Sequence, residues 1–164
     1  MDIKRLDESH ATEYRFLRLN SLKNHPEAFG SSFEEEMLNS ISFYKQRLMS
    51  DDSLTLGAFI DDRLVGMITL RYGNHKKTKH SGHIHAMYVD GDYQQQGIGF
   101  ALVQGVIVEA KKRGIINLFL TVTSTNQKAI RLYEKCGFFI YGIEKRELYV
   151  NETYYDSLLM AQYL

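Results

Sequence analysis

A strand that runs into a helix through two glycines is the first segment of this chain whose residue types suit chemistry. It reads Met87-Tyr88-Val89-Asp90-Gly91-Asp92-Tyr93-Gln94-Gln95-Gln96-Gly97-Ile98-Gly99. Glycine lets a backbone approach a ligand closely, and the free N–H groups in the first turn of a helix carry partial positive charge. We therefore expect an anion site made of backbone amides, of a kind that suits a pyrophosphate. The alternative is a tight strand-to-helix turn that binds nothing.

Two better-known phosphate motifs do not fit this segment. The third glycine of a dinucleotide-binding fingerprint would fall on Leu102, and the segment lies in the middle of the chain. A P-loop needs a Gly-Lys-Ser or Gly-Lys-Thr sequence, and none follows here.

A second segment strengthens the interpretation. It reads Asn126-Gln127-Lys128-Ala129-Ile130-Arg131-Leu132-Tyr133-Glu134-Lys135-Cys136-Gly137-Phe138 and follows the next predicted strand at the spacing of a partner helix. With both segments, the chain resembles the GNAT superfamily of acyl-CoA-dependent N-acyltransferases over about residues 54–163. The pyrophosphate motif of that family, Gln/Arg-x-x-Gly-x-Gly/Ala, is matched by residues 94–99. Its second motif, Asn-x-x-Ala-x-x-Leu-Tyr-x-x-x-Gly-Phe, is matched by Asn126, Ala129, Leu132, Tyr133, Gly137 and Phe138.

The resemblance implies a fold, an acetyl donor and roles for individual residues. The fold would be of the α/β (α+β) class, a mixed sheet of about seven strands with helices on both faces. Acetyl-CoA would be the donor, with its pantetheine chain along Met87, Tyr88 and Val89, where a backbone N–H polarises the thioester carbonyl. Its pyrophosphate would lie on Gln94, Gln95, Gln96, Gly97, Ile98, Gly99 and Phe100, through the amides of residues 95–100. Asn126 would hold the pantetheine, and Tyr133 would both contact the cofactor and protonate the leaving thiolate. Without the motif, Tyr133 would be taken for a core aromatic.

The general base is sought on the strand of residues 83–89. Some protein N-terminal acetyltransferases of the family carry a glutamate where this chain has Thr121, which cannot accept a proton at neutral pH. Histone acetyltransferases carry a glutamate at the position of His83, and the segment from His83 to His85 also resembles the His-x-His strand of arylalkylamine N-acetyltransferases. Residues i and i+2 of a strand share a face, and a pKa of about 6.5 suits a base that acts directly or through water. The alternatives are structural histidines or a zinc site, but no carboxylate or cysteine completes a ligand set, so we predict no metal.

The acceptor amine is expected to meet two loops, residues 25–36 and residues 145–154. Candidate substrate-binding residues in the first loop are Phe29, Ser31, Ser32 and Glu34. The run Glu34-Glu35-Glu36 offers three carboxylates to a cationic amine. The alternative is that these acidic residues occupy the first turn of a helix, where the helix dipole favours them.

Hydrophobic periodicity indicates the elements that must position these residues. We expect helices over residues 7–25, 37–49, 98–113 and 126–136. Strands are expected over residues 3–6, 54–60, 64–72, 83–89, 115–122, 138–144 and 154–163. The nearly continuous apolar run at 115–122 predicts a strand buried on both faces. The last strand, rich in Tyr and Leu, offers an edge for a homodimer.

Composition excludes several classes of partner. The 164 residues include 20 Lys plus Arg and 20 Asp plus Glu, so no global field draws the protein to nucleic acid or to an anionic membrane surface. The single cysteine, Cys136, excludes a disulfide framework and a cysteine-cluster metal site. No apolar run suits a membrane span or a signal peptide. We expect one cytoplasmic domain over residues 1–164.

These observations predict an N-acetyltransferase that moves an acetyl group from acetyl-CoA to a primary amine by direct attack in a ternary complex. A small-molecule acceptor is favoured, and a protein N-terminus or lysine is the alternative. A non-catalytic acyl-CoA-binding module is an alternative of another class, which the presence of Tyr133 and of candidate bases disfavours.

Overall fold

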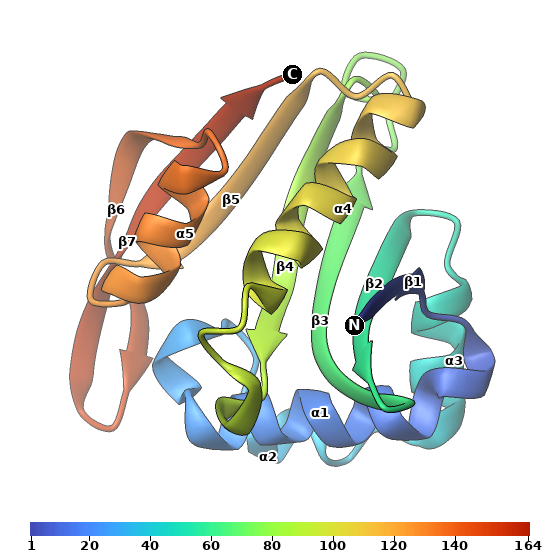
Figure 1. The fold of residues 1–164 in the computed structure, drawn as a ribbon. Helices are drawn as coiled ribbons and strands as arrows, with labels where there is room; N and C mark the ends of the chain where they lie inside the picture. Colours follow the sequence, from blue (N-terminus) through green and yellow to red (C-terminus); the bar gives the residue numbers. More distant parts are fainter.

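The computed structural model describes residues 1–164 and contains one sheet of seven strands in the order β1-β2-β3-β4-β5-β7-β6 (Figure 1). The pair β4 and β5 is parallel, and every other neighbouring pair is antiparallel. The predicted mixed sheet is therefore confirmed. The strands are β1 (Asp2–Arg5), β2 (Ser53–Ile60), β3 (Arg63–Tyr72), β4 (Ser81–Val89), β5 (Asn117–Thr123), β6 (Phe139–Val150) and β7 (Thr153–Tyr163). The α-helices are α1 (Ala11–Asn24), α2 (Phe33–Glu36), α3 (Ile41–Met49), α4 (Ile98–Lys112) and α5 (Gln127–Lys135).

Helices cover both faces of the sheet, as predicted, because each presents an apolar side to it. Helices α4 and α5 lie on one face of the sheet (Figure 1). The larger core, of 22 buried residues, includes side chains from both of these helices. In α4 the residues Ile98, Leu102 and Val106 follow one another at one-turn spacing, and all three are buried in this core. On the opposite face, α1 and α3 close a second core of ten buried residues. The two sequence motifs, at the start of α4 and in α5, therefore lie on one face of the sheet, and α1 to α3 lie on the other face.

The segment between α1 and β2 differs from the expectation. Instead of a loop to residue 36 and a helix from 37, the chain forms the short helix α2 and then α3 from Ile41. The break follows from two serine caps, because the Ser32 hydroxyl accepts from the Glu35 N–H and the Ser40 hydroxyl accepts from the Phe43 N–H, each starting a separate helix.

The predicted loop at residues 145–154 is also wrong. Strand β6 continues to Val150, and only Asn151 and Glu152, both with positive φ, separate it from β7. The alternation in β6 is hard to read because the strand is mostly exposed and the register shifts between Glu144 and Leu148. Strand β7 lies between β5 and β6, so it is not the edge that was expected, and the edge strands of the sheet are β1 and β6.

Strand β5 is buried on one face and only partly buried on the other, contrary to the expectation of two buried faces. Leu118, Leu120 and Val122 point into the larger core, whereas Thr121 on the other face is exposed. The opposite face opens instead onto a pocket that Thr121 lines. No helix of the structure has the length and apolar character needed to cross a membrane.

Candidate active site

The start of α4 presents a row of unpaired backbone amides. The first hydrogen bond of this helix runs from the Ala101 N–H to the Gly97 carbonyl (3.0 Å), and no N–H of residues 95–100 donates within the protein. Gln95 (φ 62°) and Gly97 (φ 79°) adopt the left-handed conformation, which turns successive N–H groups to the same side. This arrangement can bind an anion at the positive end of the helix dipole. The Gln94 side chain donates to the Val89 carbonyl (3.3 Å) and so ties the turn to the end of β4.

Strands β4 and β5 separate beside this turn. Their parallel pairing is limited to three residue pairs, from Ser81 with Asn117 to His83 with Phe119, and the two strands then diverge (Figure 1). A bulge marks the divergence, since the β3–β4 register shifts there and Ala86 has a φ of 51°. The end of β4 is thereby left without a β5 partner, so its backbone groups on that side are available to an extended ligand.

The sequence-predicted donor residues meet around this opening. The Met87 side chain packs against the larger core, and the Tyr88 side chain is buried in the second core on the opposite face. Since both side chains point into the protein, β4 presents its backbone groups to the opening between β4 and β5. A Cβ added to Gly99 would lie 3.0 Å from Met87 Cε and 3.0 Å from Leu132 Cδ2, which shows how closely β4, α4 and α5 approach. The Asn126 side chain accepts from the Ala129 N–H (3.2 Å) and caps α5, so its amide NH₂ group is left to bind elsewhere.

Tyr133 lies in α5 and is only 6% exposed. Its ring packs edge-on against Phe138 with the centroids 5.9 Å apart. Burial raises the pKa of Tyr133, so the phenol is protonated at neutral pH. Cys136 on the next turn is also buried, and burial raises the pKa of its thiol.

His83 and His85 lie on the other face of the sheet, in a pocket of about 710 Å³. Their side chains share one face of β4, with ring centroids 6.3 Å apart, and His83 also lies 5.3 Å from the Phe119 ring. Both side chains are open to the pocket. The pKa of His83 is lowered mainly by partial burial and to a smaller extent by the charge of Arg71. The pKa of His85 is lowered by burial and then by the charges of His83, Arg71 and Arg18. Both imidazoles are therefore neutral near pH 7 and able to accept a proton.

The predicted acceptor residues divide between the pocket and the surface. Phe29 and Ser31 line the pocket, whereas Ser32 does not line it and serves as the cap of α2. Glu34 is exposed and lies outside the pocket lining. The loop is held to the sheet by the Thr123 hydroxyl, which donates to the Glu27 carbonyl (2.6 Å).

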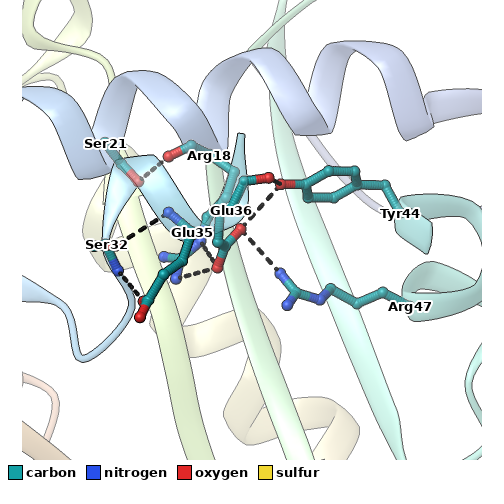
Figure 2. A network of polar contacts seen from close by, with 7 residues as sticks. All are labelled: Arg18, Ser21, Ser32, Glu35, Glu36, Tyr44 and Arg47. Atoms are coloured by element: carbon teal, nitrogen blue, oxygen red, sulfur yellow. Dashed lines mark hydrogen bonds and ion pairs between the residues drawn. The ribbon is translucent and has the colours of Figure 1, made fainter. Parts of the chain in front are cut away.

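Glu36 is not a free carboxylate, contrary to the expectation that all three glutamates attract a cation. It is 4% exposed, and its Oε1 accepts from both Nε and Nη2 of Arg18 at 3.1 and 3.0 Å (Figure 2). Its Oε2 accepts from the Tyr44 hydroxyl (3.1 Å) and lies 3.4 Å from Nη1 of Arg47. Burial alone would raise the pKa of Glu36, but Arg18, Arg47 and Tyr44 together hold it below its usual value. Burial and the neighbouring Glu36 carboxylate raise the pKa of Tyr44 to about 12.

Sequence reasoning missed the cations of this pocket. Arg18, Arg47 and Arg71 line it from α1, α3 and β3 respectively. A signal existed for two of them, since Arg18 interrupts the apolar side of its helix and Arg71 shares the Thr69 face of an otherwise apolar strand.

Known proteins resemble this chain in sequence and in fold. The model of the acetyltransferase (GNAT) family matches residues 15–138. The ribosomal protein bS18-alanine N-acetyltransferase of Escherichia coli K12 is 41% identical over 73 residues, which are 44% of this chain and 49% of that protein. The chain thus aligns with about half the length of this relative.

Solved structures match nearly the whole chain. A GNAT-family acetyltransferase from Streptococcus pneumoniae superposes with a TM-score of 0.88 and 29% identity, covering 99% of this chain and 98% of that one. An acetyltransferase from Salmonella typhimurium, solved with its cofactor acetyl-CoA, gives a TM-score of 0.82 at 17% identity, covering 100% of this chain and 94% of that one. At 17% identity, the similarity to the Salmonella typhimurium protein is a similarity of fold alone.

Proposed function

Because the chain belongs to the GNAT family of acetyltransferases, we propose that it transfers an acetyl group from acetyl-CoA to a primary amine bound beside His83 and His85. The observation that carries the proposal is the arrangement around β4. Unpaired amides and an unpartnered strand end lie on one side, and a pocket with two neutral imidazoles lies on the other. A donor thioester and an acceptor amine can therefore approach the same strand from opposite faces.

The residues of the donor side fit a nucleotide-linked thioester. The amides of residues 95–100 would hold the pyrophosphate, and the backbone of Met87 and Tyr88 would pair with the extended pantetheine chain. The free NH₂ of Asn126 would bind a pantetheine carbonyl. When bound, acetyl-CoA supplies the activated acetyl group, and a backbone N–H at the end of β4 would stabilise negative charge on its carbonyl oxygen.

His83 or His85 would remove the proton from the attacking amine. Their lowered pKa values keep them neutral at pH 7, as a base must be, and the transfer runs directly or through one water. Thr121 also lines the pocket but carries no group that accepts a proton near pH 7.

Tyr133 would return a proton to the leaving sulfur. The amine nitrogen forms the new bond to the acetyl carbon, the carbon–sulfur bond breaks, and the thiolate takes the phenolic proton. The raised pKa of Tyr133 keeps that proton in place until the thiolate forms. A buried Cys136 with a raised pKa is a poor nucleophile, which supports direct transfer over an acetylated enzyme.

A small primary amine is the first candidate acceptor, since the pocket of about 710 Å³ has the size of a small-molecule site. The N-terminal amine of a protein is the second candidate. It is favoured by the likeness to the ribosomal-protein-alanine enzyme, and the open pocket would admit the first residue of a chain.

Free-thiol detection tests this function. Acetyl-CoA is offered with amino acids, arylalkylamines, aminoglycosides, polyamines and N-terminal peptides, and mass spectrometry identifies the acetylated product. We expect thiol release that requires an amine. Stoichiometric binding of CoA without thiol release on any amine would instead support a non-catalytic acyl-CoA-binding module.

A further inference from the structure

The acceptor pocket contains a cation that no carboxylate of the protein neutralises. Arg71 lies directly opposite His83 across the β3–β4 pair, and its exposed side chain lines the pocket. No Asp or Glu oxygen lies within 4.0 Å of its guanidinium. Arg71 is thus an unpaired charge beside the imidazole proposed to deprotonate the amine.

A second arginine at the pocket, Arg18, has a guanidinium nitrogen without a hydrogen-bond partner. Arg18 is 6% exposed and gives two N–H groups to Glu36, but its Nη1 is buried without any hydrogen-bond partner. Its guanidinium stacks on the Phe29 ring, 4.8 Å from the centroid, and Phe29 itself lines the pocket. A buried guanidinium N–H without an acceptor is costly, so an oxygen supplied by a ligand would be favourable here.

The carboxylates of the pocket do not cancel this charge locally. Glu36 is shared by Arg18 and Arg47, which leaves that cluster with an excess of one positive charge. Asp52 and Glu147 also line the pocket, but both are exposed and neither pairs with an arginine. The floor near His83 and His85 is positive, and the carboxylates there are either neutralised or on the surface.

We propose that the acceptor carries a carboxylate close to its primary amine, and that Arg71 binds this carboxylate while the amine lies beside the imidazoles. This inference rests on the proposed acetyl transfer and names the class of its acceptor. A guanidinium fork matches a carboxylate in two parallel hydrogen bonds. The charge of Arg18, which also helps to lower the pKa of His85, favours the neutral form of the amine that must attack, even when the ligand carboxylate offsets the charge of Arg71. A polyamine would add further cations to a positive floor and is disfavoured.

Matched acceptors test the proposal and identify the source of the carboxylate. Alanine and alaninamide differ in the carboxylate of a free amino acid, and peptides that begin with Asp or Asn differ in an acidic side chain. We compare kcat/KM at about pH 8.5, where both imidazoles are neutral, and correct for the fraction of neutral amine. We expect the acidic member of one pair to be preferred at least about tenfold. Equal values within both pairs would overturn the proposal.

Variants then assign the preference to Arg71. In Arg71→Gln the ratio between acid and amide should fall about tenfold, towards one, and Arg71→Lys should keep part of it because a lysine holds the charge without the fork. Arg113→Gln is the matched control, since Arg113 ends α4 and stacks on Tyr72 at the other pocket, away from the imidazoles. An unchanged ratio in Arg71→Gln would contradict the assignment.

A binding measurement separates failure of this inference from failure of the proposed function. The ring signals of His83 and His85 are titrated by NMR with N-acetylalanine or its amide present, which requires no turnover. The carboxylate should raise the pKa of His85 because it offsets the field of Arg71, whereas the amide should not. If no amine releases thiol but this shift occurs, acetyl transfer is wrong and the carboxylate site stands. If neither compound shifts the pKa, the carboxylate site is wrong.

Discussion

Replacing Glu36 by glutamine removes the one negative charge shared by two arginines beneath the acceptor pocket. Removing one partner of a buried ion pair costs about 3–5 kcal/mol, because the other charge is left in a medium of low polarity. Glutamine keeps the shape of the side chain and one oxygen for Arg18, but it turns an NH₂ group towards Nη1 of Arg47 in place of an acceptor. The Tyr44 hydroxyl keeps its other partner, the Glu36 carbonyl at 3.1 Å. We therefore expect the lower end of that range, about 3 kcal/mol of unfolding free energy.

The effect has a defined pH dependence. The folded-state pKa of Glu36 lies below its unfolded value, so its contribution is complete above the unfolded pKa of about 4.3. The contribution is lost as the pH falls through the folded value and the carboxylate is protonated. The difference between wild type and Glu36→Gln should thus be constant from neutral pH to about pH 5 and shrink below about pH 4.

Urea unfolding of both proteins as a function of pH measures this difference. Glu34→Gln is the matched control, since Glu34 occupies the same short helix but is exposed, and it should change stability by less than about 0.5 kcal/mol. A double variant, Arg18→Met with Glu36→Leu, should cost less than Glu36→Gln because the buried Arg18 charge is removed together with its partner, and only the partly exposed Arg47 loses a carboxylate. A loss below about 1 kcal/mol in Glu36→Gln would refute the reasoning, since it would mean that solvent already screens the pair.

Three further predictions concern catalysis and donor binding. Gly97→Val should weaken CoA binding at least about tenfold by calorimetry, because Gly97 has a φ of 79° that a valine rarely adopts. Gly91→Val is the control, since Gly91 has no positive φ, and it should leave the affinity for CoA unchanged. Equal affinity of the two variants for CoA would contradict the proposed amide site. In wild type, kcat/KM should rise with pH through a pKa below about 6.5, because burial and nearby charges lower the pKa of both histidines. The double variant His83→Ala with His85→Ala should lack this rise in kcat/KM. An identical pH profile in both proteins would exclude a histidine base. Tyr133→Phe should lower the single-turnover rate by about 10²-fold or more with CoA affinity nearly unchanged, and a change within about threefold would leave Tyr133 as a core aromatic.

The local structure of the two motif segments could be predicted from the sequence because each segment is continuous in the chain. The turn at residues 94–99 and the helix cap at Asn126 each depend on local backbone preferences. Left-handed Gly97 and the side-chain cap follow from residue type alone. The parallel step from β4 to β5 then brings the two segments together. Fold class and strand number follow from the same local patterns.

The acceptor side could not be predicted in the same way because its chemistry depends on distant residues. The sequence presents Glu36 as a carboxylate that could attract a cationic amine, and only the packing of α1 against α2 shows that Arg18 neutralises it. Arg71 becomes significant only once β3 and β4 are paired in register and place it opposite His83. The two strands of the β6–β7 hairpin are predicted, but the extension of β6 to Val150 is not, because an exposed edge strand with register shifts has no hydrophobic period to detect.

Because β4 and β5 pair over so short a length, the sheet consists of two halves that are weakly connected to each other. Strands β1 to β4 form one half and β5, β7 and β6 the other, and the only strand pairing between the halves covers three residue pairs. The larger core, which spans both halves, supplies most of the remaining cohesion. Amide hydrogens of β5 are therefore expected to exchange through a partial opening of the C-terminal half rather than through global unfolding. An extended molecule bound between the strands would act as the missing strand and slow that exchange, so protection of β5 would report on occupancy of the donor side.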